Sequence, residues 1–179
     1  TLELYNQRRA NSRYEPVDIG ITVHTGDVML GIIGEEQRME GSVVSHHVET
    51  ALDLERLSAK LGVSILLTDD TLQSVRSVNG EYRKLGMFQI DDDQPPIELY
   101  DLFAGDPEHI RKLKSETKAL FESAVEAFRQ GRFYDARERF VAVVKKNRYD
   151  LAAKLYFFEC DRYYQHGVTA DWNNALRIS

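Results

Sequence analysis

The sequence predicts an α+β segment over residues 1–105, followed by a small all-α segment over residues 106–179. Three observations predict this organisation. Short runs rich in β-branched residues alternate with amphipathic stretches up to residue 103, which is typical of a sheet covered by helices. After Gly105-Asp106-Pro107 only helical patterns remain. The charge balance also changes, from 9 basic against 18 acidic residues in the first segment to 14 against 11 in the second.

The chain begins with a predicted helix and three strands. The helix covers residues 2–12 and is broken at Tyr14–Pro16. The next two runs are rich in β-branched and aliphatic residues and flank the turn Thr25-Gly26-Asp27, so we expect them to pair as a hairpin that Gly34-Glu35-Glu36 closes. The three strands are predicted at residues 17–24, 28–33 and 42–44.

The next predicted element is an amphipathic helix over residues 46–61. Apolar residues recur in it every three or four positions, at Val48, Ala51, Leu54, Leu57 and Leu61. Gly62 provides the C-cap. A buried strand over residues 63–68 follows, and Thr68 is expected to cap a short helix over residues 69–75. Two further strands, 82–90 and 97–103, are joined by the turn at residues 91–96.

The second segment has the small and aromatic residues of a helical hairpin. Ala124 and Ala136 are small residues in successive helical patterns, and Gly131 lies in the turn between them. This pattern resembles a tetratricopeptide repeat, and residues 151–167 would form the next helix. One and a half repeats are too few to stand alone, because each unit buries its apolar face on a neighbour. We therefore expect these helices to pack on the first segment or on another chain.

Composition excludes several classes of function. The acidic first segment and mildly basic second segment do not fit a nucleic-acid-binding surface. No apolar run approaches the roughly 18 residues of a membrane span, so we expect no direct membrane contact. Cys160, the only cysteine, excludes an internal disulfide. Its apolar neighbours in LYFFECDRYY predict a buried structural thiol rather than a reactive one.

Residues 26–62 resemble the second half of a class III nucleotide cyclase domain. The family pattern T-H-T-G-x-V-x-x-G-x-x-G corresponds to the stretch VHTGDVMLGIIG at residues 23–34, which has Val23 in place of the first Thr, and a strand followed by a helix comes after it, at 42–61. The resemblance covers about residues 1–103 and implies part of the ferredoxin-like cyclase homology fold. In that family an earlier strand-helix-helix-strand portion carries two metal-binding aspartates, and nothing before Thr25 resembles it.

The same resemblance assigns the family's functional positions to residues of the wrong chemistry. The family Asn falls on Glu49, the family Arg on Asp53, and a phosphate-binding Lys on Asp91. Carboxylates cannot donate hydrogen bonds while ionised and repel a triphosphate. We therefore predict that no catalytic residue remains in this stretch. Ser42 occupies the position that reads the base in the family. Its hydroxyl could contact a purine there, but we favour the interpretation that Ser42 is an ordinary strand serine.

We predict no metal site in this sequence. His46, Glu49 and Asp53 share one helix face by spacing, but a solvated helix N-terminus accounts for them, since acidic residues are favourable there. Asp91-Asp92-Asp93 lacks the glycine and the later glutamate of a calcium loop and reads as a solvated turn. No cofactor is expected, and Mg²⁺ or Mn²⁺ would be needed only if a larger parent protein is active.

Three functions follow as hypotheses. The first is a non-catalytic dimerisation or regulatory module in bacterial cyclic-nucleotide signalling, as a homodimer or with a cyclase-like partner chain. The second is a fragment of a parent adenylate or guanylate cyclase whose metal-binding half lies outside this chain. The third is a scaffold whose helical tail binds a peptide. The expected location is the cytoplasm, as a free protein or as the cytoplasmic portion of a membrane-attached sensor.

Overall fold

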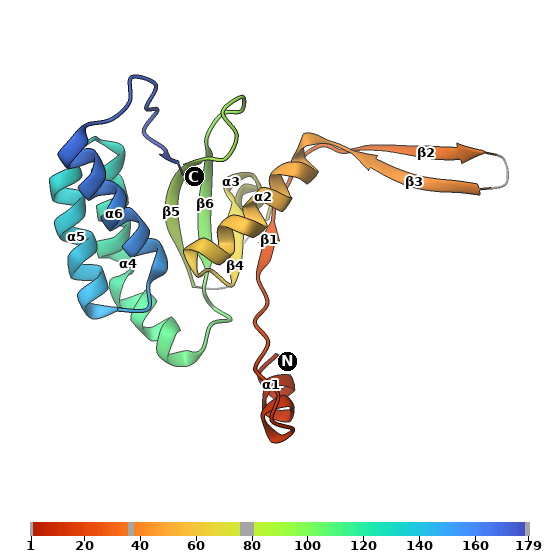
Figure 1. The fold of residues 1–179 in the computed structure, drawn as a ribbon, viewed down its shortest axis with the longest axis horizontal. Helices are drawn as coiled ribbons and strands as arrows, with labels where there is room; N and C mark the ends of the chain where they lie inside the picture. The colour runs from red at the N-terminus through yellow and green to blue at the C-terminus, as the bar shows by residue number, and fades with distance from the viewer. Residues whose placement is uncertain (1, 36–37, 76–80, 178–179) are drawn as a thin grey trace.

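The computed structural model describes residues 2–35, 38–75 and 81–177, with side chains outside residues 33–40. Its main body is a five-stranded mixed sheet in the order β1-β4-β6-β5-β7 with helices packed against it, which confirms the predicted α+β class (Figure 1). Helix α1 (Leu2–Asn11) forms as predicted and buries none of its residues. Its link to the following segment includes two 2.8 Å hydrogen bonds between the Asn6 side chain and the backbone of Val17.

The predicted hairpin between residues 17–24 and 28–33 is wrong. Strand β1 (Ile21–Val23) instead lies parallel to β4 (Ile65–Thr68) in the main sheet. Strand β2 (Met29–Glu35) pairs antiparallel with β3 (Arg38–Val44), from Met29 opposite Val44 to Glu35 opposite Arg38. A helical crossover explains the first pairing, because parallel strands need a long connection and α2 supplies it. Strand β2 runs through Gly34 and Glu35, where a turn was expected; Glu36 of that turn lies outside the described residues.

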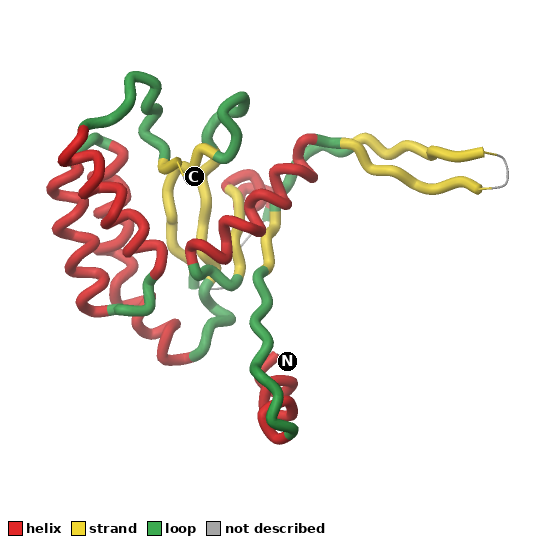
Figure 2. Tube along the Cα trace, viewed as in Figure 1, coloured by secondary structure: helices red, strands yellow, loops and turns green. Residues whose placement is uncertain are grey.

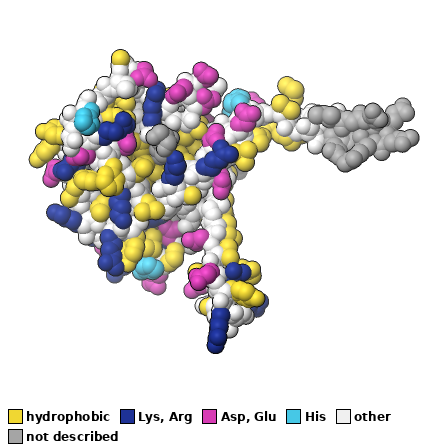
Figure 3. All heavy atoms as spheres, viewed as in Figure 1, with side chains coloured by type: hydrophobic (Ala, Val, Ile, Leu, Met, Phe, Trp, Pro, Cys, Tyr) yellow, Lys and Arg dark blue, Asp and Glu magenta, His cyan; other side chains and the backbone are white. Residues whose placement is uncertain are grey.

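Strands β2 and β3 form a long two-stranded ribbon, which we call the arm. It extends away from the rest of the molecule, as Figure 1 shows. Among the described residues, the two strands pack mainly against each other rather than against the body. The arm is rich in exposed apolar side chains near the body, and Figure 3 shows hydrophobic atoms along this part.

Helix α2 (His46–Leu61) matches its prediction in both bounds and C-cap. Ser45 accepts a hydrogen bond from the backbone N–H of His47 as the N-cap, and Gly62 adopts the left-handed conformation that ends the helix. Its buried residues Leu54, Leu57 and Leu61 face the sheet. Helix α3 (Asp69–Ser74) also forms, but the predicted side-chain cap by Thr68 is wrong, because the Thr68 hydroxyl lies beside His24 and Thr71 instead.

The central strands β5 (Tyr82–Gln89) and β6 (Ile97–Leu102) were predicted almost to the residue. Leu85 and Phe88 of β5 and Leu99 of β6 belong to the core on one face of the sheet. On the other face the hydroxyl of Tyr100 donates to Asp69 of α3, so the sheet carries α2 on one side and α3 on the other.

The second segment contains α4 (Glu108–Arg129), α5 (Phe133–Lys146) and α6 (Leu151–His166), in the positions expected from the sequence. Figure 2 shows these helices gathered beside the sheet. Their buried residues, including Ala124, Ala136 and the predicted buried Cys160, share one apolar core with α2 and the sheet. The expectation that these helices pack on the first segment is therefore confirmed.

Two side chains show how closely this packing holds the helices to the sheet. Tyr156 of α6 stacks on Phe140 at 4.9 Å between ring centroids and donates a 2.8 Å hydrogen bond to the backbone oxygen of Leu85.

The prediction that only helices follow residue 106 is wrong in one place, because strand β7 (Leu176–Arg177) pairs parallel with Phe88 and Gln89 of β5. Among the described residues, no helix is both long and apolar enough to span a bilayer.

Candidate functional site

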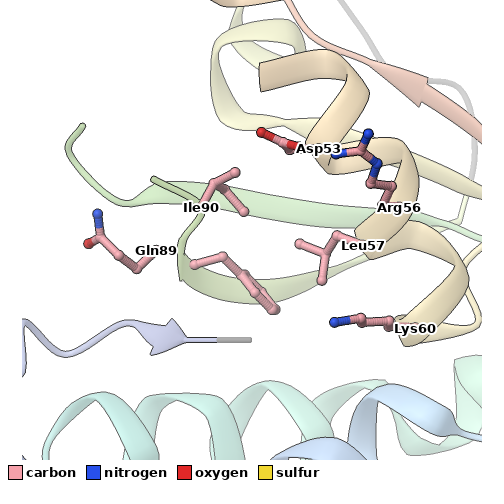
Figure 4. A pocket seen from close by; sticks show the side chains of 7 residues that line it. Asp53, Arg56, Leu57, Lys60, Gln89 and Ile90 are labelled. Atoms are coloured by element: carbon pink, nitrogen blue, oxygen red, sulfur yellow. Dashed lines mark hydrogen bonds and ion pairs between the residues drawn. The ribbon is translucent and has the colours of Figure 1, made fainter. Parts of the chain in front are cut away.

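A cavity of about 230 Å³ lies between α2 and the end of β5, where the sequence places the substituted family Arg. Figure 4 shows its lining: Asp53, Arg56, Leu57, Lys60, Phe88, Gln89 and Ile90. The helical period explains the arrangement. One face of α2 packs on the core through Leu54, Leu57 and Leu61. Asp53 and Lys60 each precede one of these leucines, so they lie along the edge of that face, beside the cavity.

Two of the charged side chains that line this cavity form an ion pair within α2. Arg56 Nη1 lies 2.9 Å from Asp53 Oδ1, three residues apart on the helix. The side chains are 76% and 46% exposed, so the pair contributes at most about 1 kcal/mol to stability. In Figure 4, Arg56 lies beside Asp53, and Lys60 projects from the helix towards the strand. The cavity is therefore lined by two basic side chains and one acidic side chain.

The opposite wall is held in place by Gln89. Its side-chain amide nitrogen donates to the backbone oxygens of Asp91 at 2.5 Å and Gln94 at 2.6 Å. Its side-chain oxygen accepts a hydrogen bond from Asn173, in the segment that leads to β7. Since both ends of the Gln89 amide are occupied by these bonds, this residue organises the turn after β5.

Of the four positions singled out from the sequence, the cavity lining includes Asp53. Glu49 is exposed on the first turn of α2, and Asp91 is exposed in the turn after β5, where it accepts a 3.1 Å hydrogen bond from the backbone N–H of Asp93. Ser42 is half-buried on β3 of the arm, opposite Gly31. The lining of this cavity therefore does not bring the four positions together.

Sequence reasoning missed the two basic residues of the cavity. Arg56 and Lys60 follow Asp53 at three and seven residues, a spacing that puts all three along one side of a helix. That spacing was visible once the helix over residues 46–61 was predicted. The family positions of Glu49 and Asp53 by themselves do not point to these two neighbouring cations.

A second group of charges lies under the helices, away from this cavity. Arg83 of β5 is paired with Asp101 and Asp150, and Lys114 of α4 lies 2.9 Å from Asp101 and 2.6 Å from Asp106. Arg83 and Asp101 are 1% and 0% exposed. Burial raises the pKa of Asp101, against the opposing effect of Arg83 and Lys114. This network joins the sheet to the helices rather than forming an open site.

Two adenylate cyclases are similar to this chain in sequence. The adenylate cyclase of Dictyostelium discoideum described as terminal-differentiation specific is 22% identical over 150 residues, which are 83% of this chain and 7% of that protein. An adenylate cyclase of Anabaena cylindrica is 29% identical over 59 residues, which are 33% of this chain and 12% of that protein. The chain is similar to adenylate cyclases.

This similarity is weak, and it concerns a small part of each relative. The matched stretches cover far less than two thirds of the length of either adenylate cyclase. No family model matches the chain, and no solved structure matches it. The comparisons therefore link the chain to adenylate cyclases as a related segment, in agreement with the resemblance seen around residues 26–62.

Proposed function

We propose that this chain is a degenerate class III nucleotide cyclase homology domain that acts as a non-catalytic dimerisation and regulatory module in cyclic-nucleotide signalling. In this proposal the sheet with α2 and α3 is part of the ferredoxin-like cyclase fold, and α4–α6 are a tetratricopeptide-like tail. The module pairs with a second copy or with a cyclase-like chain in the cytoplasm, and it needs no cofactor. Its similarity to adenylate cyclases supports the relationship.

The substituted positions support the loss of catalysis. Asp53, at the position of the family Arg, already holds Arg56 in an ion pair, and Glu49 is an exposed carboxylate. Cyclisation requires cationic and amide donors aimed at the phosphate where charge develops. Carboxylates at these two positions repel the negative charge of the phosphate instead of stabilising it.

The observation that carries the pairing function is the exposed apolar arm. Met29, Leu30 and Ile32 of β2 are each 74–75% exposed, and Val44 of β3 is 64% exposed. An isolated two-stranded ribbon is marginally stable in water, and exposed apolar patches mark interaction sites. Leu30 and Ile32 lie on one face of the ribbon with Val43 opposite Leu30, while Met29 and Val44 lie on the other. Both faces of the arm therefore offer apolar contact to a partner.

Sedimentation velocity of the full chain tests this proposal. The chain is expected to form dimers at micromolar concentration, and Ile32→Asp is expected to weaken dimerisation at least tenfold, because a buried unpaired charge in an interface costs several kcal/mol. Phe158→Asp is the matched control, since Phe158 is 65% exposed on α6, away from the arm. A chain that stays monomeric at all concentrations, or an equal effect of both variants, would contradict homodimerisation through the arm.

A second candidate is favoured by the two basic side chains of the cavity. Arg56 and Lys60 line the space beside Asp53, and cations of this kind attract phosphate groups. In this alternative the chain is a fragment of a parent cyclase, with the metal-binding half supplied outside it. Cyclic AMP or GMP production by a longer parent protein, lost on Lys60→Ala and retained in Lys112→Ala on α4, would establish this alternative.

A further inference from the structure

The arm joins the body at a root with two side-chain links. On the incoming side β1 leads through His24 to Asp27, and on the outgoing side β3 leads through Ser45 into α2. Ser45 Oγ donates a 2.7 Å hydrogen bond to the backbone oxygen of Asp27, and His24 Nε2 lies 2.9 Å from His47 Nδ1. Because the strands of the arm pack mainly on each other, this root sets the direction in which the arm points.

The hydrogen bonds beyond the second link continue to three threonine hydroxyls. His24 Nδ1 lies 3.1 Å from Thr68 Oγ1, which lies 3.1 Å from Thr71 Oγ1. Thr71 Oγ1 also lies 3.0 Å from Thr25 Oγ1 and 3.1 Å from the backbone oxygen of Val23, which only accepts. Each hydroxyl has one proton, so the direction of this series and the tautomer of His24 are set together.

The link between His24 Nε2 and His47 Nδ1 needs one donor and one acceptor. One added proton is compatible with the link, because a protonated imidazole still donates to a neutral one. When both rings are protonated, all four ring nitrogens carry protons. Two N–H groups then face each other at 2.9 Å and the link is broken.

The surroundings of His24 disfavour its protonation. Burial lowers the pKa of His24, and the neighbouring His47 and His46 of α2 lower it further, while Asp70 of α3 opposes them. Asp27 in the loop and Asp70 line an open cavity together with His47. His24 therefore becomes protonated only in more acidic solution than an ordinary histidine.

We propose that His24 and His47 form a proton-controlled latch that holds the arm in its observed direction and releases it when both rings are protonated. The latch is closed at neutral pH and opens in acidic solution, below the ordinary histidine value of 6.5. Tight packing supports its closed form, since a Cβ added to Gly26 would meet the His47 ring at 2.2 Å. The latch concerns the free chain and does not depend on what the arm contacts.

Distance measurements between spin labels test the latch directly. Leu30→Cys on the arm and Lys112→Cys on α4 supply two labels in a Cys160→Ser, Ile32→Asp background, in which the arm is expected to stay free of a second copy. Unlabelled protein of the same background is added so that only pairs within one chain are read. The distance distribution is expected to be narrow at pH 8 and to broaden at pH 5. In His24→Gln, which has no titratable ring, the distribution is expected to be the same at both pH values, whereas the control His46→Gln keeps the wild-type response.

Two results would overturn the proposal. The first is a wild-type distribution that does not change between pH 8 and pH 5, or a change that persists in His24→Gln. The second needs no variant: nitrogen NMR of the imidazole rings at pH 5 should show both His24 and His47 protonated on both nitrogens. A neutral ring at a pH where the distance distribution has already broadened would separate the release of the arm from protonation and exclude the latch.

Discussion

Arg83 of β5 and Asp150, the N-cap of α6, form a buried two-pronged ion pair across 67 positions of the chain. Nη1 lies 2.5 Å from Oδ2 and Nη2 lies 3.1 Å from Oδ1. Asp150 Oδ1 also accepts the backbone N–H of Ala153, so one carboxylate both caps α6 and fastens it to the sheet. Asp101 accepts from the remaining guanidinium nitrogen, Nε, at 3.0 Å.

Breaking this pair should destabilise the protein strongly. Arg83→Leu leaves the buried carboxylate of Asp150 without a cation and leaves Asp101 with Lys114 alone, which is expected to cost about 3–5 kcal/mol in the free energy of unfolding. Urea denaturation followed by circular dichroism measures it. Arg137→Leu is the matched control, because the side chains of its ion pair with Asp161 are 31% and 35% exposed and solvent screens the pair, so its loss should cost much less. Equal losses in the two variants would contradict the structural importance of Arg83.

Gly86 is expected to be irreplaceable even by alanine. It lies at an irregularity in the pairing of β5 with β6, has φ of +111°, and a Cβ there would meet Tyr156 Oη and Val125 Cγ1 at 2.7 Å. Gly86→Ala should therefore cost about 2 kcal/mol or more, because backbone strain and overpacking add. In Gly105→Ala, where nothing lies within 4 Å, thermal unfolding should change little. A wild-type melting temperature in Gly86→Ala would show that the tail is not packed this closely on the sheet.

Acidification should lower the stability of the protein through His24. Its pKa in the folded protein is lowered mainly by burial, so the unfolded chain binds more protons as the pH falls below the ordinary histidine value of 6.5. The stability contribution of neutral His24 is present above that value and is lost below it. The free energy of unfolding is therefore expected to decline from pH 7 to pH 5 in the wild type and less steeply in His24→Gln. Parallel curves for the two proteins would contradict this assignment.

Cys160 should be unreactive in the folded protein. Burial raises the pKa of its thiol to about 12, so almost no thiolate is present at neutral pH. Reaction with a thiol-specific disulfide reagent is expected to be slow at pH 8 and to become fast only in denaturant. Immediate reaction of one thiol per chain under native conditions would show that α6 does not bury this residue.

Local patterns in the sequence predicted most of the elements but not how the strands pair. The apolar spacing of Leu54, Leu57 and Leu61 with Gly62 was enough to place α2. The turn at Thr25-Gly26-Asp27 equally favoured a hairpin, yet β1 pairs with β4 because α2 provides the crossover. Local cues cannot decide between partners that are adjacent and partners that lie forty residues away.

The candidate site was predictable in part. The carboxylate at Asp53 was recognised from its position, and the nearby Arg56 follows from ordinary helix spacing. The link between His24 and His47 was out of reach, because it depends on where β1 lies beside α3 and α2. The Arg83 network was equally hidden, since its members come from two strands and two helices that the fold alone brings together.

Calorimetric titration of the full chain with ATP or GTP and Mn²⁺ tests most directly whether the nucleotide chemistry has been lost. With carboxylates at Glu49 and Asp53, no saturable heat of binding is expected up to millimolar nucleotide, in the wild type as in Lys60→Ala. Saturable binding at micromolar concentration that weakens in Lys60→Ala would place the triphosphate in the cavity beside Asp53 and would contradict a non-catalytic module.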